Sequence, residues 1–268
     1  VYIERVTQSQ FTGSFWKFYP EYFKGFYGFG GNFAWMGLHL WYLMMLFLFS
    51  LVALPLFQRI KEKGYRTIWV RMFGLANSMG TIVVPIILIF VIEVIVNLNP
   101  GGIGRRDFGG WSPFTYLLFF VMGDVLMQDD SFAAIIEKVR YLTLGVGLVC
   151  VVLGFIVVTS GYPGRGLLFT AIRAIMSWSG ILWILGFGSR YLKVNNRFLS
   201  YANPAVLPFY ILHQTVIVGI GFFLANLAMN PYLKYLLLAV SSLAVIMFVY
   251  ELFVRRISFL RYLFGMKA

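Results

Sequence analysis

Residues Ala205–Leu227 read AVLPFYILHQTVIVGIGFFLANL, an apolar run with no Asp, Glu, Lys or Arg and with one histidine, His213. A helix needs about 20 mainly apolar residues to cross a hydrocarbon core roughly 30 Å thick. This run is long enough. It predicts a membrane-spanning helix that carries a polar side chain at membrane depth.

The composition of the whole chain agrees with that prediction. Of its 268 residues, 60% are hydrophobic and 12% are charged, and the mean hydropathy is +0.81. Soluble domains are about 45–50% apolar and about 25% charged, and only lipid removes the need for a polar surface. We expect an all-α, polytopic membrane helix bundle without a soluble domain. The only cysteine, Cys150, cannot form an intrachain disulfide.

The same length criterion gives about seven candidate spans, of which the second, third and fourth are short. They are Phe33–Phe57, Thr81–Asn97, Pro113–Met127, Leu142–Val158, Leu167–Phe187, Ala205–Leu227 and Tyr232–Phe253. Residues 1–32 form an aromatic-rich outer segment, which is interpreted as an interfacial belt or a lid, and residues 258–268 form a basic tail.

Lys and Arg are distributed unequally between the two sets of loops. One set carries fourteen of them and the opposite set carries seven, with Arg173 inside a span. Cytoplasmic loops retain positive charge, so the bias predicts an outer N-terminus and a cytoplasmic C-terminus in the plasma (inner) membrane. Seven spans, an odd number, also place the two ends of the chain on opposite sides of the membrane. The concentration of Lys and Arg in the cytoplasmic loops accounts for the net charge of +12, so we expect no nucleic-acid partner.

The sequence lacks the motifs that are typical of several kinds of site. There is no glycine-rich phosphate loop, no His/Cys/carboxylate cluster at metal spacing and no serine nucleophile elbow, so we expect no metal and no tightly held cofactor. The inner basic loops could also hold the phosphates of a nucleotide-like donor. The alternative explanation is that the positive charges of these loops only orient the protein in the membrane.

His213 is the first candidate for catalysis. Asn203 suits a helix N-cap and Pro204 the first helical position, which would place His213 about 13 Å into the membrane core. An imidazole there can act as a general base on a hydroxyl. The alternative is a histidine that only joins helices by a hydrogen bond, with Gln214 in the same contact.

Arg173 is the second catalytic candidate, because a cation at membrane depth needs an anionic partner or a watery cavity. It could stabilise developing negative charge or hold an anionic ligand, or it could form a purely structural pair with Glu93. Glu93, His39, Trp41 and Gln214 are the candidates for substrate binding.

Three stretches together resemble the acyltransferase family 3 membrane O-acyltransferases, of the glucans biosynthesis protein C type. They are GNFAWMGLHLWYL at 31–43, GGW at 109–111 leading into YLLFF at 116–120, and LPFYILHQTVI at 207–217. The resemblance extends over nearly the whole chain, with residues 33–257 as the membrane domain.

The resemblance implies transfer of an acetyl- or succinyl-type group from an acyl-CoA donor to a carbohydrate or glucan hydroxyl. Family members have about ten spans, and their Arg and His eleven residues apart on the first span have no counterpart here. The chain begins with Val and resembles the last seven helices. We therefore expect the first three spans to precede it, and a first-span histidine to share one cavity with His213.

A membrane carrier or flippase for an acyl group or a lipid-linked sugar is the alternative function. Transporters also place His, Arg and Glu inside the membrane. Against this alternative, no pair of Gly- or Pro-broken spans recurs at equivalent positions in two halves of the chain.

Overall fold

The structure is a computed structural model. It describes residues 1–34, 39–62, 77–106, 109–127, 130–161, 165–192 and 194–266. Part of the first resemblance stretch, residues 35–38, lies outside the described residues. So do Asp107 and five of the basic residues behind the orientation, Lys63, Arg66, Arg71, Lys193 and Lys267.

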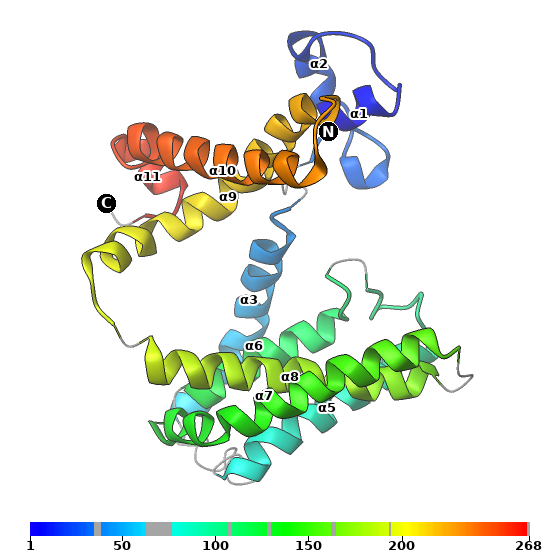
Figure 1. The fold of residues 1–268 in the computed structure, drawn as a ribbon, viewed down its shortest axis with the longest axis vertical. Coiled ribbons are helices and arrows are strands. Elements are labelled where there is room, and N and C mark those ends of the chain that lie inside the picture. The colour runs from blue at the N-terminus through cyan, green and yellow to red at the C-terminus, as the bar shows by residue number, and fades with distance from the viewer. Residues whose placement is uncertain are drawn as a thin grey trace. The chain divides into compact units, whose positions relative to one another are not determined.

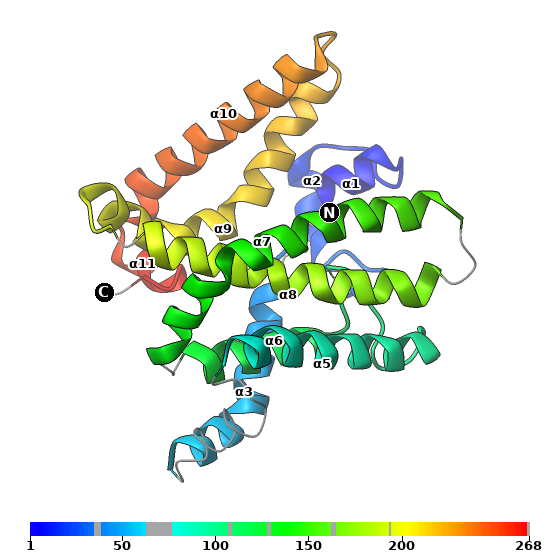
Figure 2. The same ribbon diagram turned by 60° about the horizontal axis from the view of Figure 1, so that its bottom comes forward.

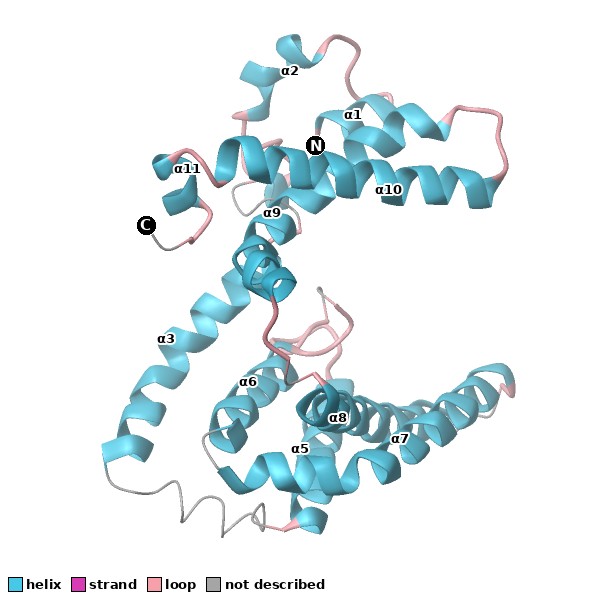
Figure 3. Ribbon diagram, turned by 60° about the vertical axis from the view of Figure 1, so that its left-hand side comes forward, coloured by secondary structure: helices cyan, strands magenta, loops and turns pink. Residues whose placement is uncertain are grey.

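Helices dominate the described part of the chain, where no strand occurs (Figures 1 and 3). They are α1 (Tyr2–Thr7), α2 (Phe15–Tyr22), the 3-10 turn η1 (Tyr27–Phe29), α3 (Trp41–Glu62), α5 (Ser78–Leu98), α6 (Pro113–Met127), α7 (Asp130–Thr159), α8 (Arg165–Tyr191), α9 (Arg197–Ala225), α10 (Pro231–Val249), the π-helical turn η2 (Tyr250–Val254) and α11 (Ser258–Leu263). Helices satisfy their own backbone hydrogen bonds, which lipid requires.

Six helices in the described residues are long and apolar enough to cross a membrane: α3, α5, α7, α8, α9 and α10 with η2. The chain is a multi-pass membrane protein. Large apolar side chains cover the outer faces of these helices, as lipid contact requires, for example Leu148, Val149 and Val152 on α7. The third expected span is α6, which has the expected bounds but only 15 residues.

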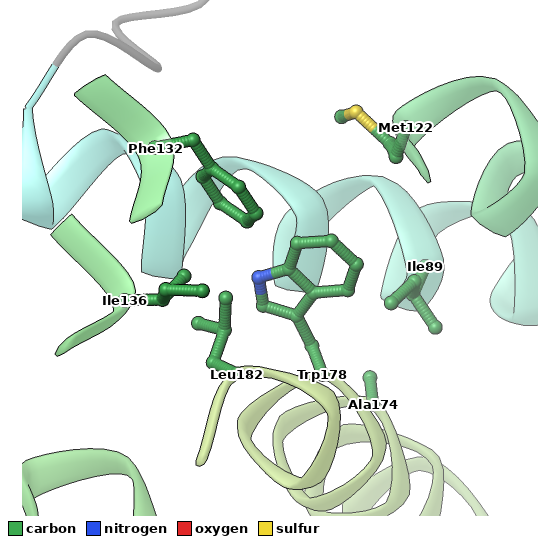
Figure 4. Close-up of a cluster of buried hydrophobic side chains, with 7 residues drawn as sticks. All are labelled: Ile89, Met122, Phe132, Ile136, Ala174, Trp178 and Leu182. Atoms are coloured by element: carbon green, nitrogen blue, oxygen red, sulfur yellow. The ribbon is translucent and has the colours of Figure 1, made fainter. Parts of the chain in front are cut away.

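The chain divides into two compact units, Val1–Met44 with Asn195–Ala268, and Met45–Val194. The second unit packs α7 beside α8 (Figure 1), with α5 against α8. Its main core contains Ile89, Met122, Phe132, Ile136, Ala174, Trp178 and Leu182 (Figure 4). The Trp178 indole donates to the carbonyl of Thr81 at 2.8 Å, which ties α8 to the start of α5.

The first unit contains the α9–α10 hairpin, whose connecting turn lies at the top of Figure 2. Asn230 caps α10 by accepting from the backbone N–H of Tyr232, and Pro231 occupies the first helical position. Ala205, Tyr250 and Val254 are buried where the other ends of the two helices meet. This packing holds α9 against the end of α10 and against η2.

The outer segment folds as short helices, none of them long enough to span. Arg5 holds it together by donating to Asn32 Oδ1 and to the carbonyl of Gly31, both at 2.9 Å. Trp16 and Phe29 are highly exposed. The belt and lid interpretations both remain predictions.

The expected start of the first span at Phe33 is wrong. The backbone N–H of Phe33 donates to the carbonyl of Gly25 at 2.8 Å, and its own carbonyl accepts from Tyr27. These bonds close the outer segment, so Phe33 is not helical and α3 begins at Trp41.

The expected start of the sixth span at Asn203 is also wrong. Asn196 is the N-cap of α9, and its side chain accepts from the backbone N–H of Leu199 at 2.8 Å. Pro204 and Pro208 lie inside the helix. Membrane helices tolerate internal proline, because neighbouring groups can satisfy the carbonyls that it leaves unpaired.

Candidate functional site

His213 lies near the middle of α9, sixteen residues after Arg197 and twelve before Ala225. Its Nδ1 lies 2.5 Å from the carbonyl oxygen of Tyr210. A carbonyl can only accept a hydrogen bond, so Nδ1 carries the proton of the neutral ring. The lone pair is then on Nε2, which is the arrangement that a general base needs.

His39 lies beside His213, within the same compact unit. The two ring centres are 5.5 Å apart and the planes are nearly perpendicular, at 87°. His39 Nε2 lies 3.0 Å from the carbonyl of Ile211, and the Tyr210 hydroxyl donates to the His39 carbonyl at 3.1 Å. The fold therefore joins two stretches that are about 170 residues apart in sequence.

The two histidine rings differ in which nitrogen is blocked. His39 donates through Nε2, so its lone pair is on Nδ1, whereas His213 keeps its lone pair on Nε2. The ring of Phe209, one turn before His213 on α9, lies parallel to the imidazole, with ring centres 6.3 Å apart.

The other two candidates near this centre are less closely involved. Trp41 is the first residue of α3, half-buried, with its ring 6.1 Å from that of Tyr42. Gln214 is exposed. Successive residues of a helix point about 100° apart, so Gln214 points in a different direction from His213.

Glu93 forms a second polar centre, in the other compact unit. Its side chain is 2% exposed, and its Oε2 forms an ion pair with Arg106 at 2.6 Å. Oε1 accepts from the Thr115 hydroxyl at 2.5 Å and from the backbone N–H of Ser112 at 3.2 Å. Arg106 also donates through Nε, which gives the carboxylate four hydrogen bonds.

The structural pair between Arg173 and Glu93 does not form. Within the described part of the chain, Arg106 is the cation at ion-pair distance from Glu93. Arg173 instead donates to the carbonyl of Gly110 at 2.5 Å, and its guanidinium lies 3.8 Å over the centre of the Trp111 ring. The Glu93 carboxylate already accepts four hydrogen bonds from closer donors, which is its full capacity. Arg173 instead lines the cavity beside Glu93.

That cavity has a volume of about 510 Å³. Polar and apolar residues from α5, α8 and the loop between α5 and α6 line it: Glu93, Val94, Asn97, Leu98, Arg106, Trp111, Gly166, Leu167, Phe169, Thr170 and Arg173. It contains both Glu93 and Arg173, whereas His39, Trp41, His213 and Gln214 belong to the first unit.

A further cavity, of about 650 Å³, lies in the first unit at the end of α9 and α10 that the charge bias places in the cytoplasm. Arg255, Arg261 and Tyr201 are among its lining residues. Arg255 also forms an ion pair with Glu251 at 2.8 Å. These arginines could contact the phosphates of a nucleotide-like donor.

Sequence reasoning missed Arg106, Ser112 and Thr115. The signal for Arg106 was present, because Arg105-Arg106-Asp107 is the only charged group in the loop that follows the Glu93 span. A buried carboxylate requires such a partner. For metal binding, no group of three His, Cys, Asp or Glu side chains gathers among the residues that the structure describes.

Comparison of the chain with protein-family models, with curated proteins and with solved structures finds no match.

Proposed function

We propose that this chain belongs to a membrane O-acyltransferase in which His213 acts as the general base. The observation that carries the proposal is the hydrogen bond from His213 Nδ1 to the Tyr210 carbonyl, which leaves Nε2 as the basic nitrogen. The sequence resemblance supplies the reaction, which is transfer of an acetyl- or succinyl-type group to a carbohydrate hydroxyl.

In the proposed step, Nε2 of His213 takes the proton of the acceptor hydroxyl as its oxygen attacks the carbonyl carbon of the acyl-CoA thioester. The tetrahedral intermediate then collapses, the C–S bond breaks, and the imidazolium returns the proton to the leaving thiolate. The rigid contact between His213 and the Tyr210 carbonyl supports this role, because it stabilises the positive charge that the ring acquires.

Donor and orientation are further parts of the proposal. The cavity lined by Arg255 and Arg261 is the proposed contact for the donor phosphates, since guanidinium groups bind phosphate well. This assignment agrees with a cytoplasmic C-terminus in the plasma (inner) membrane, where acyl-CoA is available from the cytoplasm. The acceptor is proposed to be a glucan or another carbohydrate.

The test uses the full-length gene product in lipid nanodiscs, with radiolabelled acetyl-CoA or succinyl-CoA and an oligosaccharide acceptor. We expect labelled ester from the wild type. We expect His213→Gln to lower kcat by at least about 100-fold, because it removes the base without removing a polar group. Thr215→Ala, an exposed position on the same helix, is the matched control and should keep the wild-type rate.

Two results would count against the proposal. A wild-type rate in His213→Gln would remove His213 from the chemistry. Uptake of label without any ester from the wild type would instead favour the carrier or flippase function.

A further inference from the structure

The cavity beside Glu93 combines a strongly cationic region with an apolar one. Arg106 and Arg173 are its cations, and Glu93 is its only anion among the lining residues. Arg173 lies eight residues after the first residue of α8, about 12 Å along the helix axis. A permanent positive charge at that depth is costly unless an anion or water accompanies it.

Glu93 is not the direct partner of Arg173, because its carboxylate is paired with Arg106 at 2.6 Å. Each of its carboxylate oxygens already accepts two hydrogen bonds, from Ser112 and Thr115 on one side and twice from Arg106 on the other. Four acceptor positions are all that a carboxylate offers. Within the described residues, no carboxylate lies within ion-pair distance of Arg173.

Two other polar side chains of the cavity wall, Asn97 and Thr170, are already hydrogen-bonded. Asn97 accepts from Arg106 at 2.8 Å and donates to the Thr170 hydroxyl at 3.2 Å. That hydroxyl donates in turn to the carbonyl of Gly166 at 2.8 Å. This chain of bonds fixes the wall, whereas Nε and Nη1 of Arg173 donate to no residue that the structure describes.

The orientation of Arg173 defines what can approach it. Trp111 covers one face of the guanidinium at 3.8 Å, and Nη2 is held by the Gly110 carbonyl. The group has five N–H donors in one plane, so its remaining donors are offered at its edge. An oxyanion with two oxygens fits such an edge by paired hydrogen bonds.

Apolar side chains form the rest of the wall, from Val94 and Leu98 on α5 and from Leu167 and Phe169 on α8. Leu98 and Leu167 are themselves exposed, at 81% and 60%, on helices that span the membrane. Leu98 is the last residue of α5 and Leu167 the third of α8, so the cavity has hydrocarbon at the ends of these helices and Arg173 further along α8. A ligand that matches both parts has an anionic head and an apolar tail.

We propose that this cavity is a binding site for an anionic amphiphile, whose carboxylate or phosphate head contacts Arg173 and whose tail lies along Leu98, Leu167 and Phe169. This site is built by residues of the second unit, whereas the histidine pair belongs to the first, and the proposal does not depend on acyl transfer.

The binding test uses the full-length protein in nanodiscs made only of phosphatidylcholine, which carries no net charge. Tritiated decanoate is the probe, and its saturable binding is competed by unlabelled decanoate, dioctanoyl phosphatidic acid or decanol. We expect the first two to compete and decanol to fail, because decanol has the same tail without the charge. The stronger competitor identifies the head as fatty carboxylate or phospholipid phosphate.

Variants locate the binding at Arg173. Arg173→Gln should weaken decanoate binding by at least about tenfold, as loss of a hydrogen bond to a charged group does. Arg173→Lys keeps the charge without the paired donors and should lie between Gln and the wild type. Arg105→Gln removes one charge from the nearby loop, does not line the cavity and should bind as the wild type does.

The proposal is overturned if the wild type shows no saturable decanoate binding, or if decanol competes as well as decanoate. It is also overturned if both Arg173 variants bind as the wild type does, or if Arg105→Gln weakens binding as much as Arg173→Gln. The competition arm needs only wild-type protein, so it decides the question even where Arg173→Gln does not fold.

Discussion

At the scale of single residues, the two ion pairs at Glu93 and Glu251 have similar lengths and very different surroundings. The Glu93–Arg106 distance is 2.6 Å with side chains 2% and 24% exposed, and the Glu251–Arg255 distance is 2.8 Å with side chains 35% and 53% exposed. Water screens the second pair and replaces its partners easily. Removing the Glu93 carboxylate leaves the buried side of Arg106 with only Asn97 Oδ1 and a backbone carbonyl as acceptors, and no anion.

We therefore predict that Glu93→Leu lowers the stability of the protein by about 3 kcal/mol, which corresponds to a fall in melting temperature on the order of 10 °C. The double variant Glu93→Leu/Arg106→Leu should be less destabilised than the single one, because it removes the stranded cation as well. Thermal unfolding in detergent can be followed with a thiol-reactive dye, since the only cysteine, Cys150, is buried.

Glu251→Leu is the matched control and should leave the melting temperature nearly unchanged. If it destabilises the protein as much as Glu93→Leu does, burial is not what distinguishes the two pairs. A double variant that is worse than Glu93→Leu alone would show that Arg106 contributes mainly through Asn97, to which it also donates.

The cation that pairs with Glu93 could be predicted from the sequence only in part. The need for a partner follows from a carboxylate inside an apolar run, and both Arg106 and Arg173 were available. The choice depends on the loop between α5 and α6 turning back so that Arg106 reaches α5. Spacing along the chain does not specify that return.

At the scale of secondary-structure elements, the contact between α7 and α8 depends on one glycine. A Cβ added at Gly186 would lie 2.5 Å from the backbone oxygen of Ile136 and 2.9 Å from Cβ of Arg140. Neither atom belongs to a flexible side-chain end, so the two helices would have to separate. At Gly188, two residues further along α8, an added Cβ meets nothing within 4 Å.

This difference predicts opposite effects of the same substitution. Gly186→Ala should lower the melting temperature, because it forces α7 and α8 apart. Gly188→Ala should keep or raise it, because alanine favours a helix over glycine by about 1 kcal/mol. The same Cys150 dye assay measures both variants. Equal effects in the two variants would mean that the helices do not approach as closely at Gly186 as the structure places them.

Helix identity could be predicted from the sequence far better than helix ends. Every expected span overlaps a helix, because long apolar runs form little else in lipid. The start of α9 was misplaced because Asn203-Pro204 and Asn196 both match a helix start. Local pattern cannot choose between two such signals, whereas the contact of Tyr201 with Tyr250 favours the earlier start, which places Tyr201 on the helix.

At the scale of the whole molecule, α6 decides the parity of the topology. Its 15 residues extend about 22 Å, less than the roughly 30 Å core, whereas the other six spanning helices are longer. With α6 as a crossing, seven spans place the two ends of the chain on opposite sides. Without it, six spans place both ends on the same side. The distribution of Lys and Arg, which predicts ends on opposite sides, would then disagree with the number of spans.

We predict that α6 crosses, since a short helix can be accommodated by local thinning of the bilayer beside longer neighbours. In that case Gly101, before α6, and Ser160, after α7, lie on the same outer side. Gly101→Cys and Ser160→Cys, each in a Cys150→Ala background, should both react with a membrane-impermeant maleimide in intact cells. Arg256→Cys should react only after permeabilisation. Reaction of Gly101→Cys but not of Ser160→Cys would show that α6 does not cross. Reaction of neither would show that the protein has the opposite orientation in the membrane.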